Sequence, residues 1–224
     1  MDPLTTAADA ILRAGRRLGS RGLISAGEGN ISVRLDADRI LVTPAGGRKD
    51  ELEADDLVVV WLGHPARDAT SRTGLGPTSD LAIHLAVHAA RPEIGSFAHA
   101  HLPAAMGLTL AGEVPDPGAL PETALFLPRL PFLTVELPGS QRLAERITAA
   151  LTEPPEPFAA AVLLERHGAC AVGRDPGQAV DRLELVEVLC KTWRDALLIR
   201  AAKAGLAMVD PSPSGPGSRS EEGR

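Results

Sequence analysis

A predicted β-hairpin near the N-terminus limits the choice of fold more than any other pattern in this chain. Residues 31–35 alternate apolar and polar side chains, residues 40–42 are apolar, and Asp36-Ala37-Asp38 between them favours a turn. Further strands are predicted over 57–62, 94–100, 131–137, 159–164 and 169–172. Because helical patterns are interspersed with these strands, we expect a largely antiparallel sheet covered by helices rather than a doubly wound parallel sheet.

Helices are predicted over residues 4–22, 78–90, from about 103, over 140–151 and over 176–204. The proline-rich segment 112–130 is predicted to be irregular, and His64 is predicted to lie in a solvent-facing loop. Residues 209–224 are rich in Pro, Ser, Gly and Glu, so we expect a disordered tail. The remainder, residues 1–208, is predicted to be one domain.

Composition excludes several classes of function. The net charge of −6 argues against nucleic acid or an anionic membrane as the main partner, and no apolar run approaches the roughly 20 residues of a membrane span. Cys170 and Cys190 lie in apolar patterns typical of buried thiols in a reducing cytoplasm. The chain has no tyrosine, which excludes a phenol as acid or base. Its three lysines, Lys49, Lys191 and Lys203, lie in polar or charged surroundings, which argues against a lysine Schiff-base enzyme.

Three histidines indicate a metal site. His99 and His101 are two residues apart at the end of a predicted strand, so their side chains share one face and can converge on one ion. Two histidines at a strand end can also simply be solvated, but His167 before Gly168 adds a third imidazole at a turn. Three histidines plus one open position are typical of catalytic zinc. His84 is interpreted as a core or supporting histidine rather than a ligand.

Three polar turns are candidates for binding an anion. Gly29-Asn30, Ala45-Gly46 and Thr78-Ser79 combine small residues with hydroxyl or amide donors, and Thr78-Ser79 begins a predicted helix. Each turn alone could be purely structural, but together with a metal they suggest a small phosphorylated substrate. Asp80 could cap the helix, ligate the metal or act as a general base.

Taken together, the chain resembles the class II aldolase/adducin family over about residues 5–205. The matching segments keep their order and spacing: they are residues 27–34, 40–46, 77–80 with His84, 91–92, 99–101, 138–140, 164–168 and 172–173. The resemblance implies a three-layer α/β/α sandwich with a central, mainly antiparallel sheet. It also implies a homotetramer with sites at subunit interfaces.

The resemblance assigns roles to individual residues. It implies that His99, His101 and His167, with Asp80 as a further neighbour, hold a divalent ion, usually Zn²⁺. The residues implied to bind substrate phosphate are Gly29, Asn30, Gly46, Thr78 and Ser79. Asp80 stands where the family's aldolases carry the proton-transferring Glu. The family tyrosine of the helix after Asp80 is His88 here, so Glu122 becomes a candidate substitute acid.

The sequence therefore predicts a cytoplasmic, zinc-dependent class II aldolase with Asp80 as its catalytic residue. It would cleave a ketose 1-phosphate, such as fuculose 1-phosphate, reversibly to dihydroxyacetone phosphate and an aldehyde. The alternatives within the family are a sugar-phosphate 4-epimerase, dehydratase or decarboxylase. A non-catalytic, adducin-like interaction domain is the alternative from another class.

Overall fold

The strands of this chain pair into one sheet at the centre of the molecule. The computed structural model describes residues 2–64 and 69–209. Among these residues, seven strands pair in the order β3-β2-β1-β4-β7-β6-β5. Their bounds are β1 Asn30–Arg34, β2 Arg39–Val42, β3 Val58–Trp61, β4 Ser96–Ala100, β5 Phe132–Leu133, β6 Ala161–Leu164 and β7 Gly168–Gly173. Every neighbouring pair is antiparallel except β5 with β6.

The hairpin predicted from the sequence is present. Strands β1 and β2 pair with Ser32 opposite Val42 and Arg34 opposite Ile40. Asp36 stabilises the turn, because its carboxylate accepts hydrogen bonds from the backbone N–H groups of Asp38 and Arg39 at 3.0 and 2.8 Å. The mainly antiparallel sheet expected from this hairpin is confirmed.

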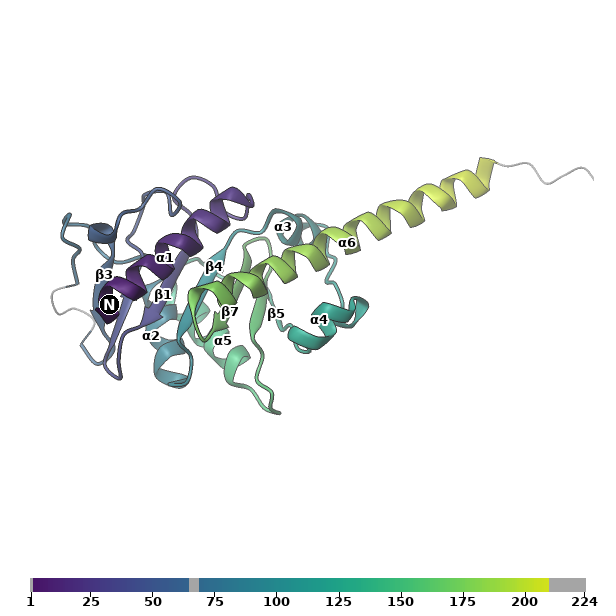
Figure 1. Ribbon diagram of the computed structural model, residues 1–224. Helices are drawn as coiled ribbons and strands as arrows, with labels where there is room; N and C mark the ends of the chain where they lie inside the picture. Colours follow the sequence, from purple (N-terminus) through teal and green to yellow (C-terminus); the bar gives the residue numbers. More distant parts are fainter. Residues whose placement is uncertain (1, 65–68, 210–224) are drawn as a thin grey trace, which may run out of the picture.

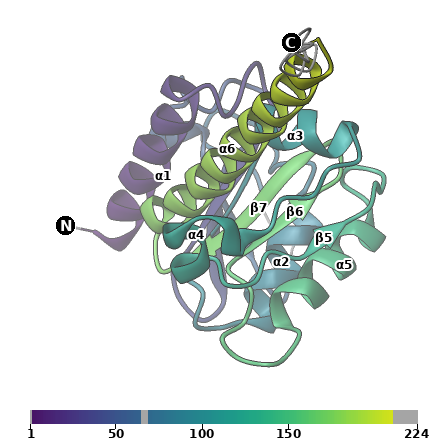
Figure 2. The same cartoon turned by 90° about the vertical axis from the view of Figure 1, so that its right-hand side faces the viewer.

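Helices cover both faces of the sheet (Figures 1 and 2). They are α1 Pro3–Ser20, α2 Leu81–Ala90, α3 Pro103–Leu110, α4 Pro121–Phe126, α5 Gln141–Thr152 and α6 Pro176–Val209, with short 3₁₀ turns at Ala54–Asp56 and Pro117–Ala119. One apolar cluster joins α1, α3 and α6 to the sheet, and a second joins α2 and α5 to its opposite face. The result is the three-layer α/β/α sandwich that the sequence predicted.

The alternation of side chains along β4 explains the two layers. Phe97 packs in the cluster with α2 and α5, whereas Ala98 and Ala100 pack in the cluster with α1, α3 and α6. Strand β7 repeats this pattern, with Val172 on the first side and Ala171 on the second. The small alanines leave room for α6 to pack against β4 and β7 at the centre of the sheet.

Two segments differ from the sequence prediction. Segment 112–130 was expected to be irregular, yet it contains helix α4. Pro121 suits the first turn of this helix, and the buried Thr123 hydroxyl anchors it by donating to the Pro117 carbonyl at 2.6 Å. The strand predicted over 131–137 is reduced to Phe132–Leu133, because only these residues pair with β6.

Helix α6 is longer than predicted, and Figure 1 shows its C-terminal part extending beyond the rest of the fold. Within the described part of the chain, no helix has the length and apolar character needed to cross a membrane. The tail predicted over 209–224 lies outside the described residues except for Val209, the last residue of α6. The domain boundary at residue 208 therefore stays a prediction.

Candidate metal centre and substrate pocket

The three histidines predicted to bind a metal meet at one end of the sheet. His99 lies in β4, His101 follows that strand, and His167 lies in the turn between β6 and β7. Their ring centroids are 4.7 to 5.0 Å apart, and one ligand atom of each lies within 4.8 Å of the other two. The antiparallel pairing of Ala100 with Ala169 brings these distant segments together. The three side chains could therefore hold one metal ion.

Gly168 makes this meeting possible. Its φ is +112°, a conformation that residues with a side chain rarely adopt. A Cβ atom at this position would lie 2.1 Å from the Ala100 carbonyl oxygen and 2.9 Å from the Cα atom of His101. The backbone after His167 therefore approaches the His99–His101 segment as closely as only glycine allows.

The hydrogen bonds of His99 leave one ring nitrogen suited to a metal. Its Nδ1–H donates to the Ala169 carbonyl at 3.0 Å, so its Nε2 carries a lone pair. This Nε2 is buried and has no hydrogen-bond partner in the described structure. Burial lowers the pKa of His99 well below its usual value, and burial together with His101 lowers the pKa of His167. Neutral imidazoles with an unpartnered lone pair fit a divalent ion.

Glu28 orients His101, a role that the sequence analysis missed. Its Oε2 lies 3.1 Å from His101 Nδ1, while its Oε1 accepts from the N–H and hydroxyl of Ser25 at 2.7 and 2.8 Å. A carboxylate on Nδ1 of a histidine leaves Nε2 free and fixes the ring for metal binding. The only signal in the sequence was an acidic residue inside a glycine-rich turn.

Asp80 lies beside the histidines but is held by a different partner. It is the residue before α2, yet its side chain makes no capping hydrogen bond. Its carboxylate is 8% exposed and accepts from Asn30 Nδ2 at 2.7 Å. The group of mutually close ligand atoms comprises the three histidines without Asp80. Its roles as ligand and base stay predictions.

A cavity of about 250 Å³ opens onto this centre. Asp80, His101 and His167 line it, together with all of the predicted phosphate-binding residues. The predicted phosphate-binding residues are Gly29, Asn30, Gly46, Thr78 and Ser79. Glu122 is elsewhere in this chain, in a cavity between α4 and α6. Residues that the sequence singled out in five separate segments therefore line one pocket.

Backbone groups in the pocket suit an anion to different degrees. The N–H groups of Gly29, Gly46 and Ser79 have no hydrogen-bond partner in the described part of the chain, and neither has the Ser79 hydroxyl. The N–H of Thr78, by contrast, donates to the Thr43 carbonyl at 3.1 Å. Unpaired donors on the lining of one cavity are a feature of sites that can bind an anion such as phosphate.

Lys49 holds two of these loops together. Its Nζ is 2.7 to 2.9 Å from the carbonyl oxygens of Gly27, Gly46 and Gly47, and the residue is 3% exposed. Burial lowers the pKa of its ammonium group. Lys49 therefore lies in the polar surroundings that the sequence predicted. Its three hydrogen bonds stabilise the loops of Gly27 and of Gly46-Gly47 at the wall of the pocket.

The remaining histidines occupy the positions that the sequence indicated. His64 is exposed. His84 is fully buried, with hydrogen bonds to Asn30 and Ser32, which confirms its interpretation as a core histidine beside the site.

Comparison with known proteins supports the family assignment. The chain is 34% identical over 200 residues to methylthioribulose-1-phosphate dehydratase of Acidiphilium cryptum, covering 84% of this chain and 90% of that protein. It is 30% identical over 190 residues to 3-oxo-tetronate 4-phosphate decarboxylase of Haemophilus influenzae, covering 83% and 85%.

A solved structure has the same fold. The crystal structure of L-fuculose-1-phosphate aldolase from Thermus thermophilus superposes with a TM-score of 0.73 at 26% identity, covering 88% of this chain and 96% of that one. Residues 9–194 match the model of the class II aldolase and adducin N-terminal domain. The chain therefore belongs to the class II aldolase and adducin family.

Proposed function

We propose that this protein is a metal-dependent dehydratase of a ketose 1-phosphate. One observation carries the proposal: the unpartnered, buried Nε2 of His99 lies among three clustered histidines beside the Asp80 carboxylate, in a pocket with free N–H donors. The curated relatives, a dehydratase and a decarboxylase, favour the alternative of the sequence analysis over fuculose-phosphate cleavage.

The histidines would hold the ion, and zinc is the ion that three neutral imidazoles fit best. When bound, it would supply Lewis-acid polarisation of the substrate carbonyl and its neighbouring hydroxyl. The phosphate end of the substrate would bind the N–H groups of Gly29, Gly46 and Ser79, which line the same pocket. Binding at both ends would orient the reacting carbons toward Asp80.

In this proposal Asp80 moves one proton. Its carboxylate takes the proton from the carbon beside the carbonyl, and the electron pair of that C–H bond forms a carbon–carbon double bond. The hydroxyl on the next carbon leaves and takes the proton back from the Asp80 carboxyl, so that water departs. One carboxyl group serves as base and then as acid, which suits a chain without tyrosine.

Decarboxylation of an oxo-acid sugar phosphate is the second candidate. The H. influenzae relative is named for that activity, and its similarity to this chain extends over most of both proteins. Here the bond to the carboxylate carbon breaks instead of C–H, and its electron pair stays on the carbon that remains. Asp80 would deliver to that carbon a proton that it first takes up from solvent.

We also propose that the protein is cytoplasmic and assembles as a homotetramer, as the family resemblance implies. Sedimentation equilibrium would test the tetramer, and a monomer at micromolar concentration would contradict it.

The test of function is a panel of three substrates with the zinc-loaded enzyme: methylthioribulose 1-phosphate, 3-oxo-tetronate 4-phosphate and fuculose 1-phosphate. We expect loss of water from the first. Release of carbon dioxide from the second alone would select decarboxylation, and dihydroxyacetone phosphate from the third alone would restore the aldolase. Absence of turnover on all three, with metal bound, would support the non-catalytic alternative. Asp80→Asn is the matched control, since it keeps the shape and removes the base.

A further inference from the structure

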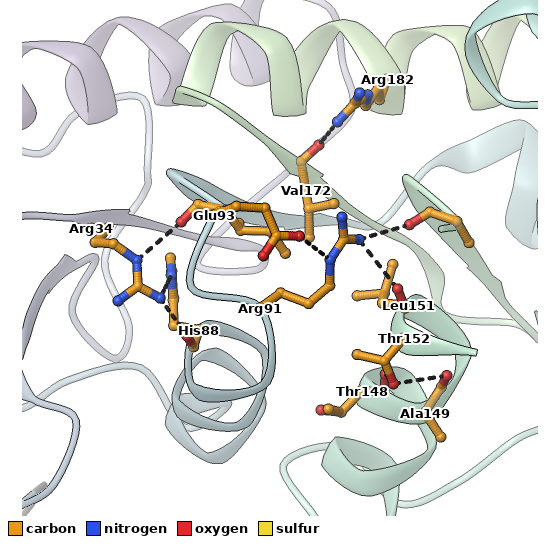
Figure 3. Close-up of polar contacts among 12 residues, drawn as sticks. Arg34, His88, Arg91, Glu93, Thr148, Ala149, Leu151, Thr152, Val172 and Arg182 are labelled. Atoms are coloured by element: carbon orange, nitrogen blue, oxygen red, sulfur yellow. Dashed lines mark hydrogen bonds and ion pairs between the residues drawn. The ribbon is translucent and has the colours of Figure 1, made fainter. Parts of the chain in front are cut away.

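A continuous line of buried polar side chains runs from the pocket through the layer between β1 and α2. Its hydrogen bonds join Asp80 to Asn30 (2.7 Å), Asn30 to His84 (2.8 Å), His84 to Ser32 (2.7 Å) and Ser32 to His88 (2.9 Å). Arg34 ends the line 3.4 Å from His88 Nδ1 and also donates to the His88 carbonyl (Figure 3). We refer to these six residues as the β1–α2 chain.

We propose that the β1–α2 chain is a one-directional hydrogen-bond relay that fixes the Asp80 carboxylate for catalysis, with His84 as its central positioning residue. The inference rests on the proposed function of Asp80 as the proton-transfer group. It adds residues that belong neither to the histidine cluster nor to the lining of the pocket: Ser32, His84, His88 and Arg34.

The donor and acceptor of every hydrogen bond in the β1–α2 chain follow from the residue at its pocket end, Asp80. An ionised Asp80 can only accept, so Asn30 turns its Nδ2 toward it and its Oδ1 toward His84. Since Oδ1 also only accepts, His84 must donate from Nε2. A neutral His84 then has a lone pair on Nδ1 and accepts from the Ser32 hydroxyl.

The same logic continues to the guanidinium group. With its proton committed to His84, the Ser32 oxygen accepts from His88 Nε2–H. His88 Nδ1 then carries the lone pair that faces Arg34 Nη2. All donors therefore point from the Arg34 cation toward the Asp80 anion, and hydrogen bonds aligned in this way polarise and strengthen one another.

Burial keeps both imidazoles in the neutral form that this order requires. Burial, with a smaller effect of His88, lowers the pKa of His84 to about 3. Burial, with the adjacent Arg34 charge, lowers the pKa of His88 to about 3. Since neither ring gains a second proton at neutral pH, each keeps the one donor and one acceptor nitrogen that this order requires. The Asn30 amide does not pass protons along, so the relay orients Asp80 and does not conduct protons to it.

The relay also explains why Asp80 does not cap its helix. Asn30 holds Oδ2 on the sheet side, so the carboxylate cannot turn back toward the N–H groups of α2. Its rotamer is thereby fixed at the edge of the pocket. Loss of His84 would leave the buried Asn30 oxygen without a donor and allow the amide to rotate away from Asp80.

The experiment compares His84→Leu, His84→Gln and Val87→Ala. Leucine fills the space without hydrogen bonds, whereas glutamine can donate to Asn30 and accept from Ser32. Val87 is a buried apolar residue of the same helix outside the relay, so its variant controls for lost stability. We expect His84→Leu to lower kcat about tenfold with KM changed less than twofold and bound zinc unchanged. Glutamine should restore most of kcat, and Val87→Ala should retain it.

Wild-type kcat in His84→Leu, or an equal loss in Val87→Ala, would overturn the positioning role. A second readout does not depend on activity: long-range ¹H–¹⁵N NMR of the wild-type protein should show both His84 and His88 as neutral Nε2–H tautomers. A Nδ1–H tautomer at either ring would overturn the relay. If no substrate turns over while both tautomers are as stated, the proposed function fails and the relay stands as the structure that anchors Asp80.

Discussion

Acid should destabilise this protein in a way that can be traced to two buried imidazoles. An unfolded histidine titrates near pH 6.5, whereas the pKa values of His84 and His88 in the folded chain are about 3. Between these values the unfolded chain binds more protons than the folded chain, so stability falls as the pH falls. Above pH 6.5 both states are neutral at these positions, and this contribution is constant.

The loss of unfolding free energy can be calculated from the difference between the pKa values of the unfolded and folded chain. Each histidine removes about 1.4 kcal/mol of unfolding free energy per pH unit once the pH is well below 6.5. Allowing for partial protonation near the midpoint, each removes about 2 kcal/mol between pH 7 and pH 5, and the pair about 4 kcal/mol. That is a large share of the 5–15 kcal/mol typical of a domain.

Urea unfolding of the wild type and of His84→Gln, both with a chelator present, would measure the effect. The other titratable groups, the three clustered histidines included, are common to both proteins, so their contributions cancel in the difference. Glutamine should therefore lose about 2 kcal/mol less than the wild type between pH 7 and pH 5. Equal losses in the two proteins would refute the assignment of His84 as a buried neutral imidazole.

Four further changes test the site and its supports. His99→Ala should reduce bound metal to near zero on elemental analysis; retained stoichiometric metal would contradict the assignment of this ligand. Glu28→Gln should weaken zinc binding about tenfold in a chelator competition, because His101 loses its orienting carboxylate. Gly168→Ala should abolish soluble folded protein, whereas Gly107→Ala, with open space around its Cβ, should not destabilise the fold. Lys49→Met should cost about 3 kcal/mol in urea unfolding, because three carbonyls lose a charged donor.

Local patterns in the sequence were sufficient to predict most of the fold. The hairpin around Asp36 and the helix after Ser140 depend on neighbours within a few residues, which periodicity and turn chemistry reveal. The two layers of helices, by contrast, were expected from the resemblance to a family. Helix α4 was missed because proline favours both irregular segments and first helical turns. What distinguishes the two here is the contact between the Thr123 hydroxyl and Pro117.

The candidate site was predictable where its chemistry repeats at a fixed spacing. The spacing of His99 and His101 predicts side chains on one face of a strand end, and His167 was singled out by its place at a turn before Gly168. Glu28 was missed because its role depends on a distant partner: its turn meets His101 only once β1 has paired with β4. A carboxylate in a glycine-rich turn gives no local sign of which side chain it will contact.

The β1–α2 chain forms because a strand spacing of two residues and a helix spacing of four residues place polar side chains opposite one another. Neither spacing alone predicts the hydrogen bonds between them. Asn30 and Ser32 are two apart in a strand and share one face, whereas His84 and His88 are four apart in a helix and share one face. Each pair alone is a buried polar anomaly that should cost stability. When the strand and the helix pack together, the Asn30 side-chain oxygen accepts from His84, and the Ser32 hydroxyl lies between His84 and His88. Every ring nitrogen of the two histidines then has a partner on the strand except His88 Nδ1, which faces Arg34. A sequence that buried only one of the two pairs would leave its polar groups unsatisfied, so the two pairs have to be present together for the Asp80 carboxylate to be held at the edge of the pocket.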